Sequence, residues 1–238
     1  MAHGSGGQAV DPGTGRGESA WRPGEDPVTW LLLILATVAT AAVYPQLPEQ
    51  MPIRWNLAGK PNSWAPRALV AWLGLGVAAG TNLLMSFLPA LDPRRESYPR
   101  FAGAYRLARQ SIVLTLLGVH AVTVLVGLGI PVAVERVAPL AVGILAILLG
   151  NVMGQVRRNY FFGIRTPWTL ADDEVWRRTH RMGGRLFVLG GLLCVAGALA
   201  GGVWAVAGVV VGMLGSAAGS GVYSYRVWKE LQGREGRG

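Results

Sequence analysis

Residues 159–184 read NYFFGIRTPWTLADDEVWRRTHRMGG, a polar and aromatic segment that lies between long apolar runs. Gly163 tolerates a positive φ or a close backbone approach, and Pro167 keeps the residue before it out of the helical region. Arg165 offers a rigid fork of donors beside Trp168, so we expect its guanidinium to stack on that ring and to dock into the bundle. We therefore predict a shaped turn here, and we expect function to be concentrated in it.

The residues after this turn have the spacing of a short amphipathic helix. Two pairs of opposite charge stand four residues apart on one side, Asp173 with Arg177 and Glu174 with Arg178. The other side carries Trp176, Thr179, His180 and Gly183. Gly183 and Gly184 are expected to end the helix. Such a helix would lie along the membrane surface, against the rest of the protein.

The composition indicates an integral membrane protein. Apolar residues make up 51% of the chain, charged residues only 15%, and the mean hydropathy is +0.37. Six apolar runs are each near the length of about 20 residues that crosses a bilayer. They are 28–44, 68–91, 110–132, 137–156, 186–203 and 205–225. The predicted fold is an all-α membrane protein, a bundle of six transmembrane helices with a short cytoplasmic amphipathic helix.

Lys and Arg residues are distributed unequally between the segments that join these spans. With the amino terminus inside, 18 fall in inner segments and 4 in outer ones. This bias places both termini in the cytoplasm of a cell-membrane protein. The chain then divides into a disordered cytoplasmic tail (1–27), a first helix pair (28–91) with a Pro-rich extracytoplasmic loop (45–67), a four-helix membrane region (110–226) that contains a cytoplasmic signature loop (157–185), and a basic cytoplasmic tail (227–238).

The first span has an alternative interpretation. A cleaved signal peptide would also have an apolar core, and residues 39–41, Ala-Thr-Ala, resemble a cleavage site. The long leader and the acidic pair Glu25-Asp26 directly before the run favour an uncleaved span. We therefore expect the mature protein to keep its amino-terminal tail.

Polar residues at membrane depth are few. No Asp, Glu, Lys or Arg falls inside a predicted span, which argues against a proton-coupled transporter. His120 is expected to be a neutral residue hydrogen-bonded between helices, with ligand binding as the alternative. Glycines at four-residue spacing predict close helix contacts, namely Gly150 with Gly154, Gly208 with Gly212, and Gly215 with Gly219.

Enzyme motifs are not found. The chain has no HExxH motif, no Gly-rich phosphate loop and no Cys/His cluster, and its one cysteine, Cys194, lies in an apolar run. The net charge of +9 reflects the basic inner segments, so we predict no nucleic-acid partner. Two alternatives remain for anion binding. Arginine side chains could hold an anion such as a lipid phosphate specifically, or they could contact lipid headgroups non-specifically. The candidate side chains are Arg165, Arg177, Arg178 and Arg181.

Three segments carry a resemblance to a known family. The stretch 159–170, NYFFGIRTPWTL, with EVWRRTHR at 174–181 and GRLF at 184–187, resembles the SdpI family of toxin-immunity membrane proteins. Residues 47–64, LPEQMPIRWNLAGKPNSW, resemble a small domain of unknown function that often precedes it. That pattern usually carries His where Arg54 stands here, so a metal or proton role at that position is not expected.

The resemblance implies a membrane protein that gives immunity to a secreted peptide toxin, relays its presence to a cytoplasmic regulator, or both. It implies no reaction, metal or cofactor, and its partners would be the lipid bilayer, a peptide toxin and a regulatory protein. The alternative is a transporter or enzyme that handles a small molecule or lipid, with Asn159, Arg165, Trp168 and His180 lining a cytoplasmic-side pocket. The sequence predicts no oligomeric state.

The candidate residues form two groups. Those of the signature loop are Asn159, Gly163, Arg165, Thr166, Pro167, Trp168, Thr169, Trp176, Thr179, His180, Arg181 and Gly184. Those of the outer loop are Pro48, Pro52, Trp55, Asn56, Gly59 and Trp64.

Overall fold

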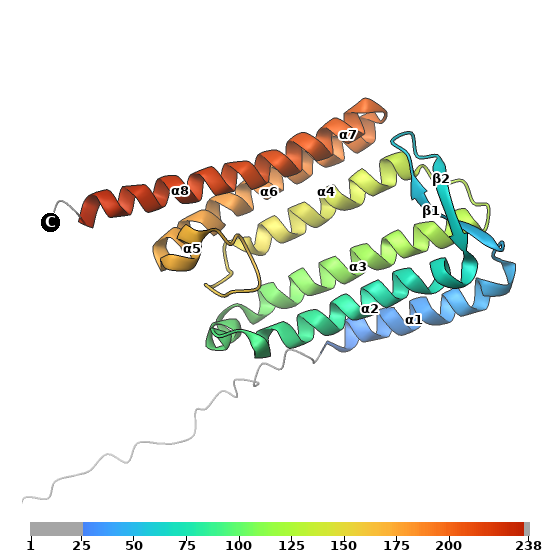
Figure 1. Cartoon of the computed structure of the whole chain (residues 1–238), viewed down its shortest axis with the longest axis horizontal. Coiled ribbons are helices and arrows are strands. Elements are labelled where there is room, and N and C mark those ends of the chain that lie inside the picture. Colours follow the sequence, from blue (N-terminus) through green and yellow to red (C-terminus); the bar gives the residue numbers. More distant parts are fainter. Residues whose placement is uncertain (1–25, 236–238) are drawn as a thin grey trace, which may run out of the picture.

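The computed structural model describes residues 26–235, and six helices in that range are long and apolar enough to cross a membrane (Figure 1). The predicted six-helix membrane fold is confirmed. The helices are α1 (Pro27–Val43), α2 (Arg67–Leu91), α3 (Ala102–Gly127), α4 (Val134–Met153), α6 (Asp173–Ala200), and a sixth in which α7 (Val203–Val209) continues through π-helical Val210–Leu214 into α8 (Gly215–Glu235).

The helices form two groups that run along a common direction (Figure 1). Helices α1, α2 and α3 pack together, and α4 packs closely against α6, which in turn contacts α7 and α8. Contact between α3 and α4 joins the groups. A strand hairpin lies at one end of the bundle, whereas α5 (Pro167–Ala171) and the α2–α3 connection lie at the other.

The outer loop contains a small sheet that the sequence analysis missed. Strands β1 (Gln50–Trp55) and β2 (Pro61–Pro66) pair antiparallel, with Pro52 opposite Trp64. Met51 and Leu47 are buried against the ends of α2 and α3. The segment predicted only as a Pro-rich loop is therefore a hairpin, fixed on the bundle.

Helix α3 begins earlier than the predicted span 110–132. Its first turns include Arg109, whose guanidinium lies 3.1 Å from the Asp26 carboxylate, both side chains being buried. Asp26 was expected in the tail, and Arg109 lies one residue before the predicted span. The two charges compensate each other, so α3 can include an arginine. Apart from Asp26 and Pro27, the predicted tail 1–27 lies outside the described residues, and so does the question of cleavage.

The sequence predicted that this helix ends at Gly183-Gly184, but α6 continues to Ala200. A Cβ at Gly184 would lie 2.6 Å from the Gly150 carbonyl oxygen, and one at Gly150 would lie 2.7 Å from the Gly184 oxygen. These glycines allow α4 and α6 to approach at backbone contact. The amphipathic helix and the fifth span are therefore one helix.

Of the other two predicted glycine pairs, one makes a close helix contact and one does not. Gly208 and Gly212 of the last span contact the backbone of α6 closely, as predicted. Gly215 meets nothing within 4 Å, so the pair with Gly219 is not a close helix contact. A tight turn joins the last two spans, and in it Gly201 and Gly202 both have positive φ, at 76° and 57°.

Candidate functional site

Asn159 holds the irregular part of the signature loop in one shape. Its buried amide donates to the carbonyls of Arg157 at 2.8 Å and Phe162 at 2.9 Å. Its Oδ1 accepts backbone N–H groups from Phe161 at 3.0 Å and Phe162. One side chain thus replaces the hydrogen bonds that a helix or strand would provide here.

A carboxylate from the α2–α3 connection ties this segment to the first helix group. Asp92 Oδ2 accepts the Tyr98 hydroxyl and the Tyr160 backbone N–H, both at 2.9 Å. Tyr98, Phe101 and Tyr105 lie in one buried cluster with Trp176. Sequence reasoning missed Asp92 because it lies far from the signature loop along the chain, and only the fold brings the two together.

The His180 side chain holds the next part of the loop, at Ile164, in place. Its Nε2 accepts the Ile164 backbone N–H at 2.9 Å, so Nδ1 carries the proton and donates to the Trp176 carbonyl at 2.9 Å. The Trp176 ring stacks on the imidazole, with centroids 4.0 Å apart. Gly163 has φ +114°, and a Cβ there would overlap His180 Nε2. The predicted special role of Gly163 in the backbone is confirmed.

Helix α5 begins with reciprocal capping by two threonines. Thr166 Oγ1 accepts the Thr169 N–H at 3.2 Å, and Thr169 Oγ1 accepts the Thr166 N–H at 2.9 Å. Pro167 occupies the first helical position, where no N–H donor is needed. The Trp168 ring contacts Tyr225 and Trp228 of α8. The Thr166 hydroxyl also donates to the Ser224 hydroxyl of α8 at 3.1 Å. The Arg-Thr-Pro-Trp turn is therefore docked on α8 through its threonine and its tryptophan.

Arg165 does not dock into the bundle, and the prediction that it stacks beside Trp168 is wrong. It is exposed, and its Nη1 donates to the Tyr160 carbonyl at 3.0 Å. The predicted four-residue charge pairs are wrong as well. Asp173 pairs with Arg158 and Arg94, and Arg178 pairs with Glu230 of α8 at 3.1 Å. Glu174 instead pairs with Arg177, three residues on.

The remaining loop candidates lie on α6. Thr179 is fully buried, and its hydroxyl has no partner within residues 26–235. Arg181 is exposed, and Gly184 lies in the contact with α4. Asn159, Arg165, Trp168 and His180 thus lie in four different surroundings. The expected common pocket of these four residues is not formed.

The outer candidates shape the hairpin. Asn56 Oδ1 accepts the backbone N–H groups of Ala58 and Lys60, both at 3.0 Å, and Gly59 has φ +71°. Gly59 also lies against Glu135 at the start of α4. Pro52 is buried, Trp55 is half-buried, and Pro48 and Trp64 are exposed. The hairpin therefore has a face fixed on the bundle and a free face.

His120 lies between helices, as predicted. Its side chain is buried, and Nε2 lies 2.9 Å from the Thr40 hydroxyl of α1. Its ring packs over Gly74 of α2, where a Cβ would lie 2.7 Å from Nδ1. The residue joins three helices.

The comparisons with known proteins agree with both sequence segments. Residues 155–224 match the SdpI/YfhL protein family, and residues 31–78 match a domain of unknown function, DUF1648. The immunity protein SdpI of Bacillus subtilis (strain 168) is 26% identical over 206 residues, which cover 87% of this chain and 97% of that protein. No solved structure matches significantly. The chain is thus a multi-pass membrane protein with a segment that matches the SdpI/YfhL family behind a segment that matches DUF1648.

Proposed function

We propose that this protein protects its host against a secreted, membrane-active peptide and that the signature loop relays the peptide's presence to a cytoplasmic regulator. The similarity to an immunity protein supports the first part. The excess of Lys and Arg in the inner segments supports an orientation with both termini and the signature loop in the cytoplasm. The hairpin then faces outward. The proposal involves no chemical reaction.

The observation that carries the proposal is the two-faced hairpin. Met51 is fully buried against Gly127 at the end of α3, so the hairpin is held in place. Away from the bundle, Trp64 of β2 is 56% exposed, and Leu57 in the hairpin turn is 78% exposed. A fixed backbone that presents an aromatic and an aliphatic side chain is suited to bind an amphiphilic peptide at the membrane surface.

A continuous set of contacts supports the relay. The hairpin turn touches α4 through Gly59 and Glu135, and α4 contacts α6 along the Gly150–Gly184 approach. At the far end of α4 and α6, His180 and Trp176 hold the loop segment. A shift of the hairpin would therefore be transmitted through packed helices to the loop.

The test is protection of sensitive cells. Cells that express the chain and cells with the empty vector are challenged with a panel of secreted, membrane-active peptides, and survival is measured at each dose. We expect protection against at least one peptide. Equal killing by every peptide, in cells whose membranes contain the protein, would refute the proposal.

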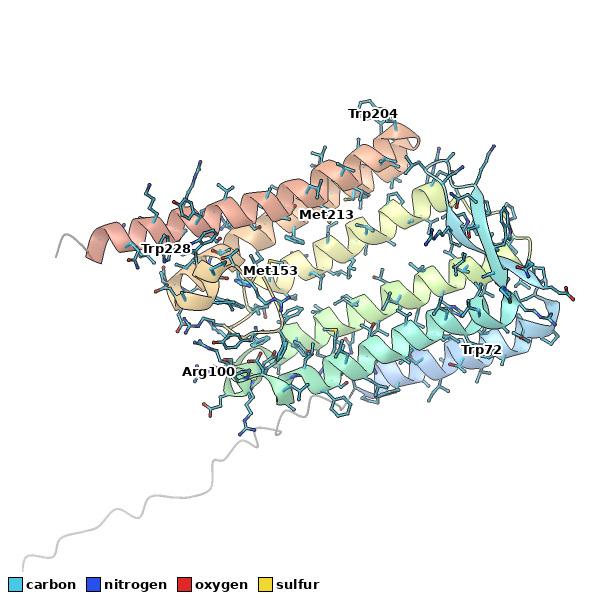
Figure 2. All side chains as sticks on the ribbon, in the orientation of Figure 1. Trp72, Arg100, Met153, Trp204, Met213 and Trp228 are labelled. Atoms are coloured by element: carbon cyan, nitrogen blue, oxygen red, sulfur yellow. The ribbon has the colours of Figure 1, made fainter. Side chains whose placement is uncertain are left out.

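Two tryptophans provide a matched comparison within this test. Trp64 lies on the hairpin, and Trp204, 66% exposed, lies at the same end of the bundle on α7 (Figure 2). Trp64→Ser should reduce protection, whereas Trp204→Ser should not. The opposite order, at equal expression, would assign peptide contact to the helix ends instead of the hairpin.

A further inference from the structure

A basic cleft lies at the signature-loop end of the molecule. It has a volume of about 670 Å³ and is lined by residues from the α2–α3 connection, the segment after α4, and the start of α6. Five arginines and two carboxylates line it, which leaves an excess of three positive charges. They are Arg94, Arg100, Arg157, Arg158 and Arg177, with Asp173 and Glu174.

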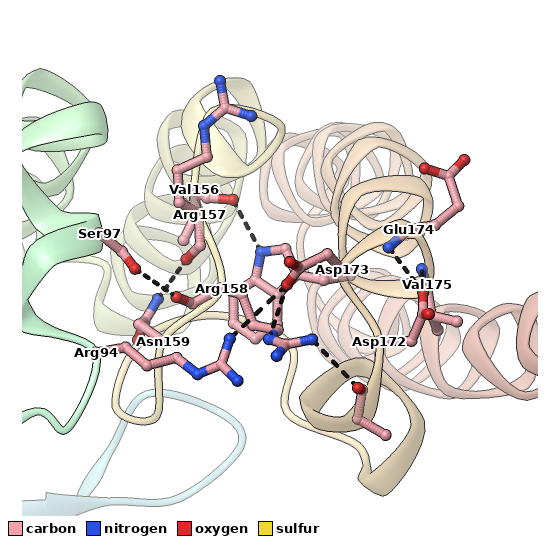
Figure 3. Close-up of polar contacts among 12 residues, drawn as sticks. Arg94, Ser97, Val156, Arg157, Arg158, Asn159, Asp172, Asp173, Glu174 and Val175 are labelled. Carbon is pink, nitrogen blue, oxygen red and sulfur yellow. Dashed lines mark hydrogen bonds and ion pairs between the residues drawn. The ribbon is translucent and has the colours of Figure 1, made fainter.

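Two of these arginines converge on one carboxylate (Figure 3). Asp173 Oδ1 lies 2.8 Å from Arg158 Nε and 3.8 Å from Arg94 Nη1. The side chain of Asp173 is 77% exposed, whereas that of Arg158 is only 17% exposed. The carboxylate thus occupies the open side of a paired-guanidinium site and can move away without unpacking the core.

Both guanidinium groups are positioned by other contacts. Arg158 Nη1 donates to the Ala171 carbonyl at 3.2 Å, and the Arg158 carbonyl accepts the Ser97 hydroxyl at 2.9 Å. The Arg94 guanidinium lies over the Tyr160 ring, 5.7 Å from the ring centroid. The Arg94 backbone N–H donates to the Asp92 carboxylate at 2.7 Å. The arrangement therefore exists before any ligand binds, which lowers the entropic cost of binding.

We propose that this cleft binds a phosphate-bearing anion and that Asp173 is an internal competitor for the same position. Guanidinium forks match the planar pairs of oxygens on phosphate, and two forks from separate chain segments can hold one group from two sides. The phosphate belongs either to an anionic lipid headgroup or to a soluble compound. This inference goes beyond the proposed immunity and does not depend on it.

Binding is measured on the purified full-length chain. One arm uses phosphatidylcholine nanodiscs with increasing phosphatidylglycerol, and the other uses inorganic pyrophosphate in neutral detergent. Binding in the first arm that pyrophosphate does not displace identifies a lipid headgroup. Binding in the second arm identifies a soluble ligand. If neither probe binds more tightly than phosphatidylcholine alone, the proposal is wrong.

Neighbouring arginines supply the matched control. Arg94 lines the cleft, whereas Arg95 is exposed beside it in the chain and does not. Arg94→Gln and Arg158→Gln should each weaken binding on the order of tenfold, because each removes a charge-assisted hydrogen bond. Arg95→Gln removes the same charge one residue along the chain and should have little effect. Equal losses of binding affinity in Arg94→Gln and Arg95→Gln would show that binding depends only on general electrostatic attraction, and the proposed site would be refuted.

Asp173 gives a test in the opposite direction. Asp173→Asn keeps the shape of the side chain but removes the competing charge, so binding should become severalfold tighter. Unchanged or weaker binding would contradict the competitor role.

Arg94→Lys keeps the charge, loses the fork and should bind more weakly than wild type. Thermal unfolding of each variant shows that the fold is retained.

Discussion

Asn159 uses its whole amide to shape residues 157–162. Asn159→Ala would remove the partner of four partly buried backbone groups, at about 0.5–1.5 kcal/mol for each lost hydrogen bond, so the loop should open while the helices remain folded. Limited trypsin digestion at the loop arginines should become faster. Asn62→Ala, on the exposed edge of β2, is the control. Equal digestion of Asn159→Ala and wild type would show that Asn159 does not hold the loop.

Arg165 shows how sequence reasoning misplaced one side chain of the signature loop. Fork donors beside an aromatic ring suggested docking, but the ring of Trp168 is used by Tyr225 and Trp228, which no local pattern could indicate. Because Arg165 makes one hydrogen bond to a neighbouring carbonyl, Arg165→Lys should protect cells as well as wild type does. A loss as large as that of Arg165→Ala would show that the fork is required.

Asp26 links stability to pH. Burial raises the pKa of its carboxyl, but hydrogen bonds from Thr29, Gln110 and Arg109 outweigh this, and the pKa lies below its ordinary value. A lowered pKa means that the ionised group stabilises the folded state above the unfolded-state pKa, and that this contribution is lost as pH falls through the folded-state pKa. Removing one partner of a buried pair costs about 3–5 kcal/mol.

The corresponding measurement compares the wild type with Asp26→Asn in detergent. At neutral pH the variant should unfold at a clearly lower temperature, and the difference should shrink as the pH falls below the ordinary range of a carboxyl. A difference that stays constant down to pH values far below that range would show that the Asp26 charge does not contribute.

At the scale of elements, glycine decides how closely helices approach. A Cβ at Gly190 of α6 would overlap the Gly212 carbonyl, whereas one at Gly215 meets nothing within 4 Å. Gly190→Ala should therefore destabilise the protein by about 1–3 kcal/mol, the usual effect of overpacking. Gly215→Ala should be neutral or slightly stabilising, because alanine favours a helix. Unfolding temperatures in detergent provide the comparison, and equal values would contradict the close approach.

The elements also show what the sequence could predict. Apolar length alone located the six spans, because a bilayer requires it. The hairpin was missed because Pro52, Pro61 and Pro66 obscure the strand pattern. The continuation of α6 through Gly183-Gly184 was not predicted, because glycine both ends helices and permits close contact between them. Only the position of α4 decides between those two roles.

The whole molecule makes a topological prediction. Cys194 is fully buried, so single cysteines can be introduced above a low background. In intact cells a membrane-impermeant maleimide should label Asn62→Cys, in the hairpin. It should label Arg95→Cys, in the α2–α3 connection, only after the cells are opened. Labelling of Arg95→Cys in intact cells would reverse the orientation and place the signature loop outside.

We expect the side of the hairpin that faces away from the bundle to contact the peptide against which the protein protects. The direct measurement is photo-crosslinking in protected cells, with the crosslinker placed at Leu57 on the hairpin or at Val203, which is also exposed at that end of the bundle. The peptide should be captured from Leu57 and not from Val203. Capture from Val203 alone, in cells that the protein still protects, would contradict it.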